Sequence, residues 1–283
     1  MSNKWASNGD INLDVMHQVQ NTLTVGMIMT PRADLQTCSQ EDSLRKTMKW
    51  NTEPYNFIPV INENDMICGL FEAQKWFNKI PPDLTIAADF QPLSESIIVG
   101  SDASIFEFIQ RADVVTTQLV VSRNKVAGLI SLSDLQKLPV RAALFTLVTS
   151  LEIVMAKRIS QRWPNSEDWV KFLSPNRAEN VELMEQKARK EDGFGSKIVF
   201  TQLADKATII GKGDLLGVSN NEINKRFRPI EKLRNDIAHA SDYASTPDAA
   251  RDVCAAVRNI LQIKQRLLDD LNAEPSVHGT SST

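Results

Sequence analysis

The chain has 283 residues, of which 42% are hydrophobic and 24% are charged, and its net charge is −3. This length suits two domains of ~100–200 residues, and the composition excludes collagen-like, low-complexity and wholly disordered proteins. Three widely spaced cysteines favour buried thiols in a reducing cytosol over a disulfide framework or a zinc site. No uninterrupted apolar run approaches the ~18 residues of a membrane span, so we expect a cytoplasmic protein without membrane contact.

Charge differs between the two halves of the chain. Residues 1–137 contain 11 Lys and Arg against 16 Asp and Glu, a net of −5, whereas residues 138–283 contain 21 against 19, a net of +2. An acidic first half is a poor surface for a polyanion. Any contact with nucleic acid is therefore expected in a local patch of the second half.

After a polar, aperiodic lead-in at residues 1–20, an internal repeat begins. Residues 39–44 start an amphipathic helix, and residues 100–105 do the same 61 residues later. The apolar strand 58–61 is answered by 118–121, and the strand 67–71, beyond a polar turn, is answered by 126–130. Two strands joined by a four-residue polar turn predict a hairpin. Each repeat therefore reads as strand, helix, strand, turn, strand and helix.

The two repeats resemble a tandem pair of CBS domains, the regulatory module of the cystathionine-β-synthase type, over residues 21–137. The first opens with Met29-Thr30-Pro31, a common entry of that family. The second carries Gly128-Leu129-Ile130-Ser131-Leu132-Ser133-Asp134, which fits the family pattern of glycine, apolar pair, Ser or Thr, two residues and Asp. The resemblance implies an α+β pair of β-α-β-β-α units that senses a regulatory adenine nucleotide.

Ser131 and Asp134 are the candidate nucleotide-binding residues. A serine between a strand and a helix can cap the helix while backbone N–H groups face a phosphate, and an acid one turn later can accept ribose hydroxyls. The alternative is a plain N-cap with an acid in the first turn. In the first repeat Glu72 and Lys75 stand at the two positions, which predicts a degenerate pocket and one nucleotide site per pair.

From residue 138 the apolar spacing becomes helical, which predicts an all-α bundle over 138–273 and a disordered tail at 274–283. Helices are expected at about 140–163, 166–173, 178–190 and 197–209. Residues 191–196 and 211–214 are read as loops because of their glycines. Ser219 with Glu222 predicts a capped helix that runs to about residue 240, and Thr246-Pro247-Asp248 begins a helix that ends near Asn272.

The segment Arg234-Asn235-Asp236-Ile237-Ala238-His239 is where catalysis is expected. It resembles the Arg-x4–6-His signature of HEPN domains, small helical bundles that include metal-independent ribonucleases and inactive binding modules. RNA cleavage by its own 2′-hydroxyl needs a group that moves a proton and a cation that stabilises phosphorane charge. Histidine and arginine suit these two tasks, so His239 and Arg234 are the candidate catalytic pair.

Geometry argues for a composite site. Positions five apart lie roughly 140° apart around a helix, so Arg234 and His239 of one chain cannot converge closely, whereas Asn235 and His239 share a face. Convergence is possible if two copies of the helix meet across a two-fold axis, as the HEPN resemblance also implies. A plain helix-end histidine with a salt-bridged arginine remains the alternative.

Two further features complete the candidate site. The approach to Arg234 is basic, with cations that could guide an RNA backbone or form an ordinary solvated face: Lys225, Arg226, Arg228 and Lys232. Glu152 is a lone acid on the apolar stripe of the first bundle helix. A buried acid needs a partner, and we expect that partner to be Arg234.

We therefore predict a nucleotide-regulated, metal-independent endoribonuclease of the HEPN type, with no cofactor for catalysis and with an adenine nucleotide as effector. RNA and a second copy of the chain are the expected partners, and a role as toxin or phage-defence effector is by analogy only. The first alternative is an inactive nucleotide-sensing protein whose helical domain serves dimerisation. The second is a CBS-type regulator of a separate enzyme.

Overall fold

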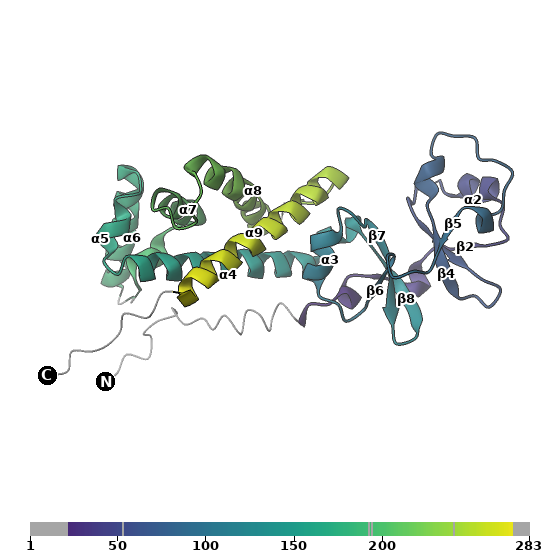
Figure 1. The fold of residues 1–283 in the computed structure, drawn as a ribbon, viewed down its shortest axis with the longest axis horizontal. Coiled ribbons are helices and arrows are strands. Elements are labelled where there is room, and N and C mark those ends of the chain that lie inside the picture. Colours follow the sequence, from purple (N-terminus) through teal and green to yellow (C-terminus); the bar gives the residue numbers. More distant parts are fainter. Residues whose placement is uncertain (1–21, 53, 192, 194, 240, 274–283) are drawn as a thin grey trace. The chain divides into compact units, whose positions relative to one another are not determined.

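The computed structural model describes residues 22–52, 54–191, 193, 195–239 and 241–273, and the described chain divides into two compact units (Figure 1). The first unit is Leu23–Val140, and the second begins at Arg141. The lead-in at 1–20 with His17, and the tail at 274–283 with His278, lie outside the described residues.

The first repeat forms a four-stranded sheet in the order β2-β3-β4-β5. Its strands are β2 (Cys38–Ser39), β3 (Ile58–Ile61), β4 (Ile67–Phe71) and β5 (Phe90–Pro92). β2 and β3 run parallel because helix α2 (Leu44–Trp50) carries the chain from one to the other, while β3 and β4 form the expected hairpin. One buried cluster joins this helix to the sheet, with Leu44, Ile58, Val60 and Phe71 at most 1% exposed.

The second repeat builds the same arrangement, which confirms the internal repeat. Its sheet has the order β1-β8-β7-β6, from β1 (Thr30–Pro31), β6 (Ile98–Gly100), β7 (Thr117–Ser122) and β8 (Lys125–Ser131), with helix α3 (Ile105–Arg111) between β6 and β7. Side chains of both sheets share a core of Ile67, Leu70, Ile97 and Leu119. We expected an α-helix after each hairpin, and this prediction is wrong. A short 3-10 helix stands there in each repeat, η4 (Ala73–Trp76) and η6 (Leu132–Gln136).

Each repeat lends its opening strand to the sheet of the other, a feature that the repeat pattern did not predict. β1 opens the first repeat yet pairs with β8 of the second, and β5 opens the second yet pairs with β4 of the first. The registers match, since Pro31 lies opposite Gly128 and Pro92 lies opposite Gly69. Proline is tolerated here because β1 and β5 are edge strands, where its missing N–H costs no ladder bond.

The second unit is helical, as predicted. Its elements are α4 (Leu138–Arg162), α5 (Ser166–Val170), α6 (Pro175–Lys190), η7 (Lys197–Phe200), α7 (Leu203–Lys212), α8 (Asn220–Ala238) and α9 (Pro247–Ala273). The single helix expected at 197–209 is instead η7 followed by α7. Gly211 and Lys212 belong to α7, so the loop expected from residue 211 begins only at Gly213. Both predicted N-caps form, with Ser219 Oγ accepting from Glu222 N and Thr246 Oγ1 from Ala249 N. Of the capping box expected at Ser219 only the serine half is present, since the Glu222 carboxylate binds Arg226.

Helix α4 carries the apolar stripe of this unit. Leu144, Leu147, Leu151, Val154 and Met155 are all fully buried. Among the described helices, α4 alone is long and apolar enough to cross a membrane by length and composition. Its sequence has no continuous apolar run of that length, but the mean hydropathy of an 18-residue window in it is high. Half of that window is buried inside the protein, and core helices pass the same test.

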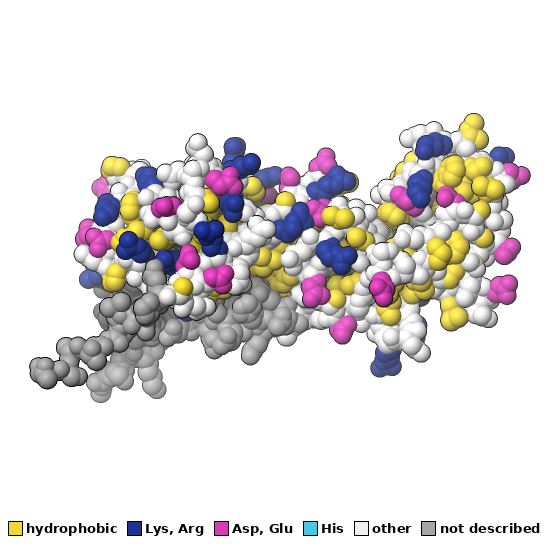
Figure 2. All heavy atoms as spheres, in the orientation of Figure 1, with side chains coloured by type: hydrophobic (Ala, Val, Ile, Leu, Met, Phe, Trp, Pro, Cys, Tyr) yellow, Lys and Arg dark blue, Asp and Glu magenta, His cyan; other side chains and the backbone are white. Residues whose placement is uncertain are grey.

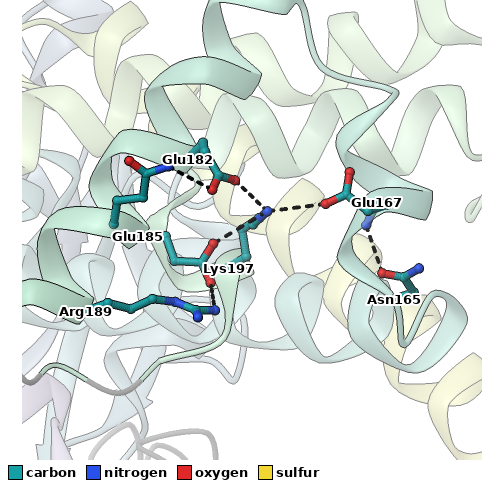
Figure 3. A network of polar contacts seen from close by, with 7 residues as sticks. Asn165, Glu167, Glu182, Glu185, Arg189 and Lys197 are labelled. Atoms are coloured by element: carbon teal, nitrogen blue, oxygen red, sulfur yellow. Dashed lines mark hydrogen bonds and ion pairs between the residues drawn. The ribbon is translucent and has the colours of Figure 1, made fainter.

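An ion-pair network ties η7 to α5 and α6 (Figure 3). Lys197 Nζ lies 2.7 Å from Glu182, 3.5 Å from Glu185 and 3.4 Å from Glu167, while Arg189 binds Glu185 at 2.7 Å. The hydrogen bond to Glu182 raises the pKa of Lys197, although partial burial opposes this effect. The network thus holds η7 against α5 and α6.

Candidate functional site

The first candidate site lies where β8 ends and η6 begins. Asp134 Oδ2 accepts the Ser131 backbone N–H at 2.6 Å and the Ser131 hydroxyl at 3.3 Å. The other oxygen, Oδ1, lies 2.7 Å from Lys137 Nζ, which also donates to the Ile28 carbonyl at 2.5 Å. Ser131 and Asp134 therefore form a reciprocal capping box, and Lys137 binds the second oxygen of the Asp134 carboxylate.

This arrangement sets a condition on ligand binding. The side chain of Asp134 is only 6% exposed, and both of its oxygens already have partners inside the protein. A ribose hydroxyl would have to share or displace these partners. Ser133 is exposed beside them, and the Lys137 side chain is 39% exposed. Sequence reasoning missed Lys137, although its spacing of three residues from Asp134 is a signal for an ion pair.

The corresponding place in the first repeat lacks this arrangement, in agreement with the departure seen in the sequence. Glu72 and Lys75 pair with each other at 2.8 Å, and Gln74 also donates to Glu72. Partial burial acts to raise the pKa of Glu72, but the hydrogen bonds from Lys75 and Gln74 outweigh it and lower that pKa. Glu72 is thus paired with residues of its own turn and has no serine partner of the kind that Asp134 has in Ser131.

The second candidate site lies at the C-terminal end of α8. His239 is the C-cap residue, and its backbone N–H bonds to the Asn235 carbonyl at 3.0 Å. Arg234, Asn235 and His239 are all exposed, and Arg234 Nη1 donates to Asn235 Oδ1 at 3.3 Å. Within the described residues the imidazole of His239 has no hydrogen-bond partner. The three candidate side chains are therefore accessible to a substrate, but the chain itself does not bring Arg234 and His239 together.

Helix periodicity separates the basic residues of α8 into two faces. At ~100° per residue, Lys225, Arg228, Lys232 and His239 lie within about 60° of one another, and Arg234 points roughly 140° away from His239. Buried residues of α8 lie between these faces: Ile223, Phe227, Ile230, Leu233 and Ile237. The predicted RNA-contact residues thus share a face with the histidine and not with the arginine.

Arg226 differs from the other three cations. It is half-buried, its Nε binds Glu222 at 2.9 Å, and its carbonyl accepts from Asn259 on α9. On the face drawn in Figure 2, Lys and Arg side chains of the helical unit are interspersed with Asp and Glu. Lys225, Arg228 and Lys232 remain exposed and available to a polyanion.

The partner expected for Glu152 is wrong. Its carboxylate lies 3.8 Å from Lys206 of α7, not at Arg234, because α7 packs beside that part of α4. Lys206 is buried and also donates to the Thr201 carbonyl at 2.6 Å. Burial lowers the pKa of Lys206, although the nearby Glu152 opposes this effect. Glu152 is thus placed to balance a buried cation in the packing of α4 against α7.

Arg141 is a residue that sequence reasoning missed. Its guanidinium donates to the Asp236 and Ile237 carbonyls, both at 3.1 Å, and to the Ser241 carbonyl at 2.7 Å. It also lies 4.9 Å from the centre of the Tyr243 ring. A helix leaves its last carbonyls without partners, and a cation there is favoured by the helix dipole. Arg141 therefore holds the end of α8 that carries His239.

No cluster of three or more His, Cys, Asp or Glu that could hold a metal ion occurs among the described residues. Cys38 and Cys254 are buried and Cys68 is half-buried, all as free thiols. Burial raises the pKa of Cys38 to about 12. Cys38 and Cys254 are therefore packed as small apolar groups, as the sequence predicted, whereas Cys68 is only partly covered.

No family model and no curated protein matches the chain. Solved CBS-domain structures are similar to it in fold over less than half of its length. The CBS domain of a bacterial CNNM/CorC family Mg2+ transporter in complex with ATP is 22% identical, covers 43% of this chain and 92% of that chain, and has a TM-score of 0.35. CBSX2 in complex with AMP is 24% identical and covers 43% and 96%, with a TM-score of 0.33. A hemolysin-like protein of Oenococcus oeni PSU that contains a CBS domain is 14% identical and covers 42% and 94%, with a TM-score of 0.33. The HEPN resemblance of the helical unit has no counterpart among these structures.

Proposed function

We propose that residues 23–137 form a CBS-type pair that binds an adenine nucleotide at the junction of β8 and η6. The observation that supports this is the grouping of Ser131, Ser133, Asp134 and Lys137 at one strand end. It offers hydroxyl and ammonium donors for phosphate beside an acid for ribose. Two of the similar structures hold ATP or AMP, so these are the first ligands to test.

A thermal-shift titration with ATP, ADP and AMP tests this site. A ligand that binds only the folded state at 100 times its Kd stabilises it by ~2.7 kcal/mol, so a clear rise in melting temperature is expected. Asp134→Ala should remove most of that rise. Because Asp134→Ala also breaks a cap, Ser104→Ala is the matched control: it removes the cap of α3, where Ser104 Oγ accepts from Phe106 N, and should retain the rise. No shift in the wild type with any of the three nucleotides would contradict the proposal.

We propose further that the helical unit cleaves RNA without a metal, in a site shared by two copies of the chain. The exposure of His239 on the same face as Lys225, Arg228 and Lys232 supports this function. As the 2′-oxygen bonds to phosphorus and the P–O5′ bond breaks, His239 takes the proton of the 2′-hydroxyl and returns it to the leaving 5′-oxygen. The guanidinium of Arg234 from the second copy stabilises the phosphorane charge. Because Arg234 points away from His239 in one chain, the pair needs two chains.

Cleavage of single-stranded RNA in EDTA, with cyclic phosphate ends, is the expected activity. His239→Ala and Arg234→Ala should each abolish it, and mixing the two variants should restore part of it, since one shared site then holds both residues. Lys187→Ala, an exposed cation on α6, is the control that should leave cleavage unchanged. Dimers that form but never cleave RNA would favour the inactive dimerisation module, and loss of activity without rescue in proven heterodimers would contradict the shared site.

Regulation follows if both activities are present. Lys137 of the nucleotide site immediately precedes α4, which begins at Leu138, so the binding residues and the first bundle helix are adjacent in the chain. Coupling of ~1–3 kcal/mol would change the cleavage rate by ~5–150-fold if it acts on the competent population. Cleavage rates measured with and without saturating ATP test this, and equal rates would contradict it.

A further inference from the structure

A groove of about 510 Å³ lies between the C-terminal part of α8 and the N-terminal part of α9. Its α8 wall is a stripe at spacings of three and four, Pro229, Lys232, Leu233 and Asp236, and its α9 wall repeats that spacing with Ala249, Asp252, Val253 and Ala256. Leu233, Val253 and Ala256 are at most 4% exposed, so the walls are packed into the protein. The small alanines of α9 leave the space that the groove occupies.

The groove has an apolar interior and a charged rim. Tyr243 lines it and is itself held beneath the Arg141 guanidinium. Arg228 and Lys232 supply cations along the α8 side, while Asp236 and Asp252 supply carboxylates from the two helices. A flat ring with polar edges, attached to a phosphate chain, would suit this groove. The ring face would pack between the apolar walls, its polar edge would meet the carboxylates, and the phosphates would meet the cations.

The groove lies next to His239, so a ring bound in it would belong to a nucleotide close to the imidazole. His239 follows Asp236 by three residues on the same face of α8, which is about 4.5 Å along the helix axis. A ring seated between α8 and α9 therefore lies within one nucleotide of the imidazole, with Arg228 and Lys232 beside the strand that carries it. This inference rests on the proposed RNA-cleaving function and specifies which part of the substrate the protein recognises.

We propose that the groove binds one base of a single-stranded RNA and selects a base that carries an exocyclic amino group. Aspartate carboxylates accept hydrogen bonds and donate none, so Asp236 and Asp252 suit the amino edges of adenine, cytosine and guanine. Uracil presents two carbonyl oxygens and one N–H, and a carboxylate repels the carbonyls. The groove thereby sets the base next to the cleaved bond.

Binding can be measured apart from cleavage with fluorescein-labelled pentanucleotides of A, C or U that carry 2′-O-methyl groups and cannot be cut. Fluorescence anisotropy should give at least tenfold tighter binding of the A and C pentamers than of the U pentamer. Ala255→Trp, at an exposed position in the groove lining, should weaken binding of the A pentamer at least tenfold. Gln262→Trp, exposed two turns later on the same face of α9, is the matched control and should change it less than twofold.

Asp252→Asn tests the selectivity, because an amide both donates and accepts. It should bring the U pentamer within threefold of the C pentamer, whereas Asp269→Asn, exposed on the same helix, should preserve the preference. Equal binding of U and C by the wild type, or unchanged binding by Ala255→Trp, would overturn the base site even if RNA is cleaved. A changed oligomeric state in Ala255→Trp with RNA affinity retained would identify an interface between copies and would overturn it too. Absence of RNA cleavage with the binding pattern intact would overturn only the catalytic proposal.

Discussion

Gly69 and Gly128 are the positions where one added methyl group is expected to damage the first unit most. A Cβ at Gly69 would lie 2.2 Å from the Gln91 carbonyl oxygen, and a Cβ at Gly128 would lie 2.4 Å from the Thr30 carbonyl oxygen. Real Cβ atoms essentially never approach closer than 3.0 Å, and both neighbours are backbone atoms that cannot rotate away. Alanine at either position must therefore push away the exchanged edge strand, β5 or β1.

The size of the effect follows from these contacts. Forcing a methyl group into a packed site costs ~1–3 kcal/mol, and each strand hydrogen bond that is lost adds ~1 kcal/mol. Gly69→Ala and Gly128→Ala are each expected to destabilise the first unit by ~2–4 kcal/mol, which for a unit of roughly 100 residues lowers its melting temperature by about 10 °C or more. The similar cost at both positions reflects the same strand exchange in both repeats.

Hydrogen exchange followed by mass spectrometry locates the effect, because the chain has two units that need not unfold together. In Gly128→Ala the amides of β1 and β8 should lose protection while those of α9 keep it. Gly195→Ala is the control, since its Cβ would meet only the Phe200 ring at an ordinary 3.9 Å. Wild-type protection of β8 in Gly128→Ala, or an equal loss in Gly195→Ala, would refute the reasoning.

Two further predictions concern buried charges in the helical unit. Arg177 binds both oxygens of Asp205, and although burial acts to raise the Asp205 pKa, this pairing and the Gln202 N–H hold it below its usual value. The stabilisation is thus present above the unfolded pKa of ~3.9 and is lost as pH falls through the lower folded pKa. Asp205→Asn should cost ~2–4 kcal/mol in urea unfolding at pH 7 and less at pH 3, and an equal cost at both pH values would contradict this. Lys264 of α9 is 4% exposed, burial lowers its pKa, and no acid among the described residues pairs with it. Since the unfolded state then binds more protons, wild-type stability should rise toward pH 10, and Lys264→Met should add ~1 kcal/mol at pH 7; a loss of stability would show that the ammonium has a partner.

The pattern of the sequence was sufficient for the two-part architecture. Short apolar runs in the strands and apolar spacing of three and four in the helices, together with side-chain caps such as Ser219 and Thr246, act over a few residues and can be read directly. The repeat offset likewise predicted two similar sheets, and the position of Ser131 after a strand predicted an N-cap with Asp134 in the first turn. These features are local, so their physical causes lie within neighbouring residues.

Features that depend on distant contacts were decided only by the tertiary structure. Nothing in the local pattern of Thr30 or Phe90 shows that each strand pairs with the other repeat, because edge pairing depends on which sheet lies within reach. Glu152 pairs with Lys206 of α7 and not with Arg234, because the fold places Lys206 beside that part of α4. Arg141 reaches the end of α8 across nearly a hundred residues of chain. Asp134 became a buried cap through Lys137, whose ammonium also holds the Ile28 carbonyl. Sequence spacing thus determined the secondary structure and the candidate polar residues, whereas packing determined their partners. The physical reason is that a charged side chain or an edge strand pairs with the complementary group that the fold brings within bonding distance.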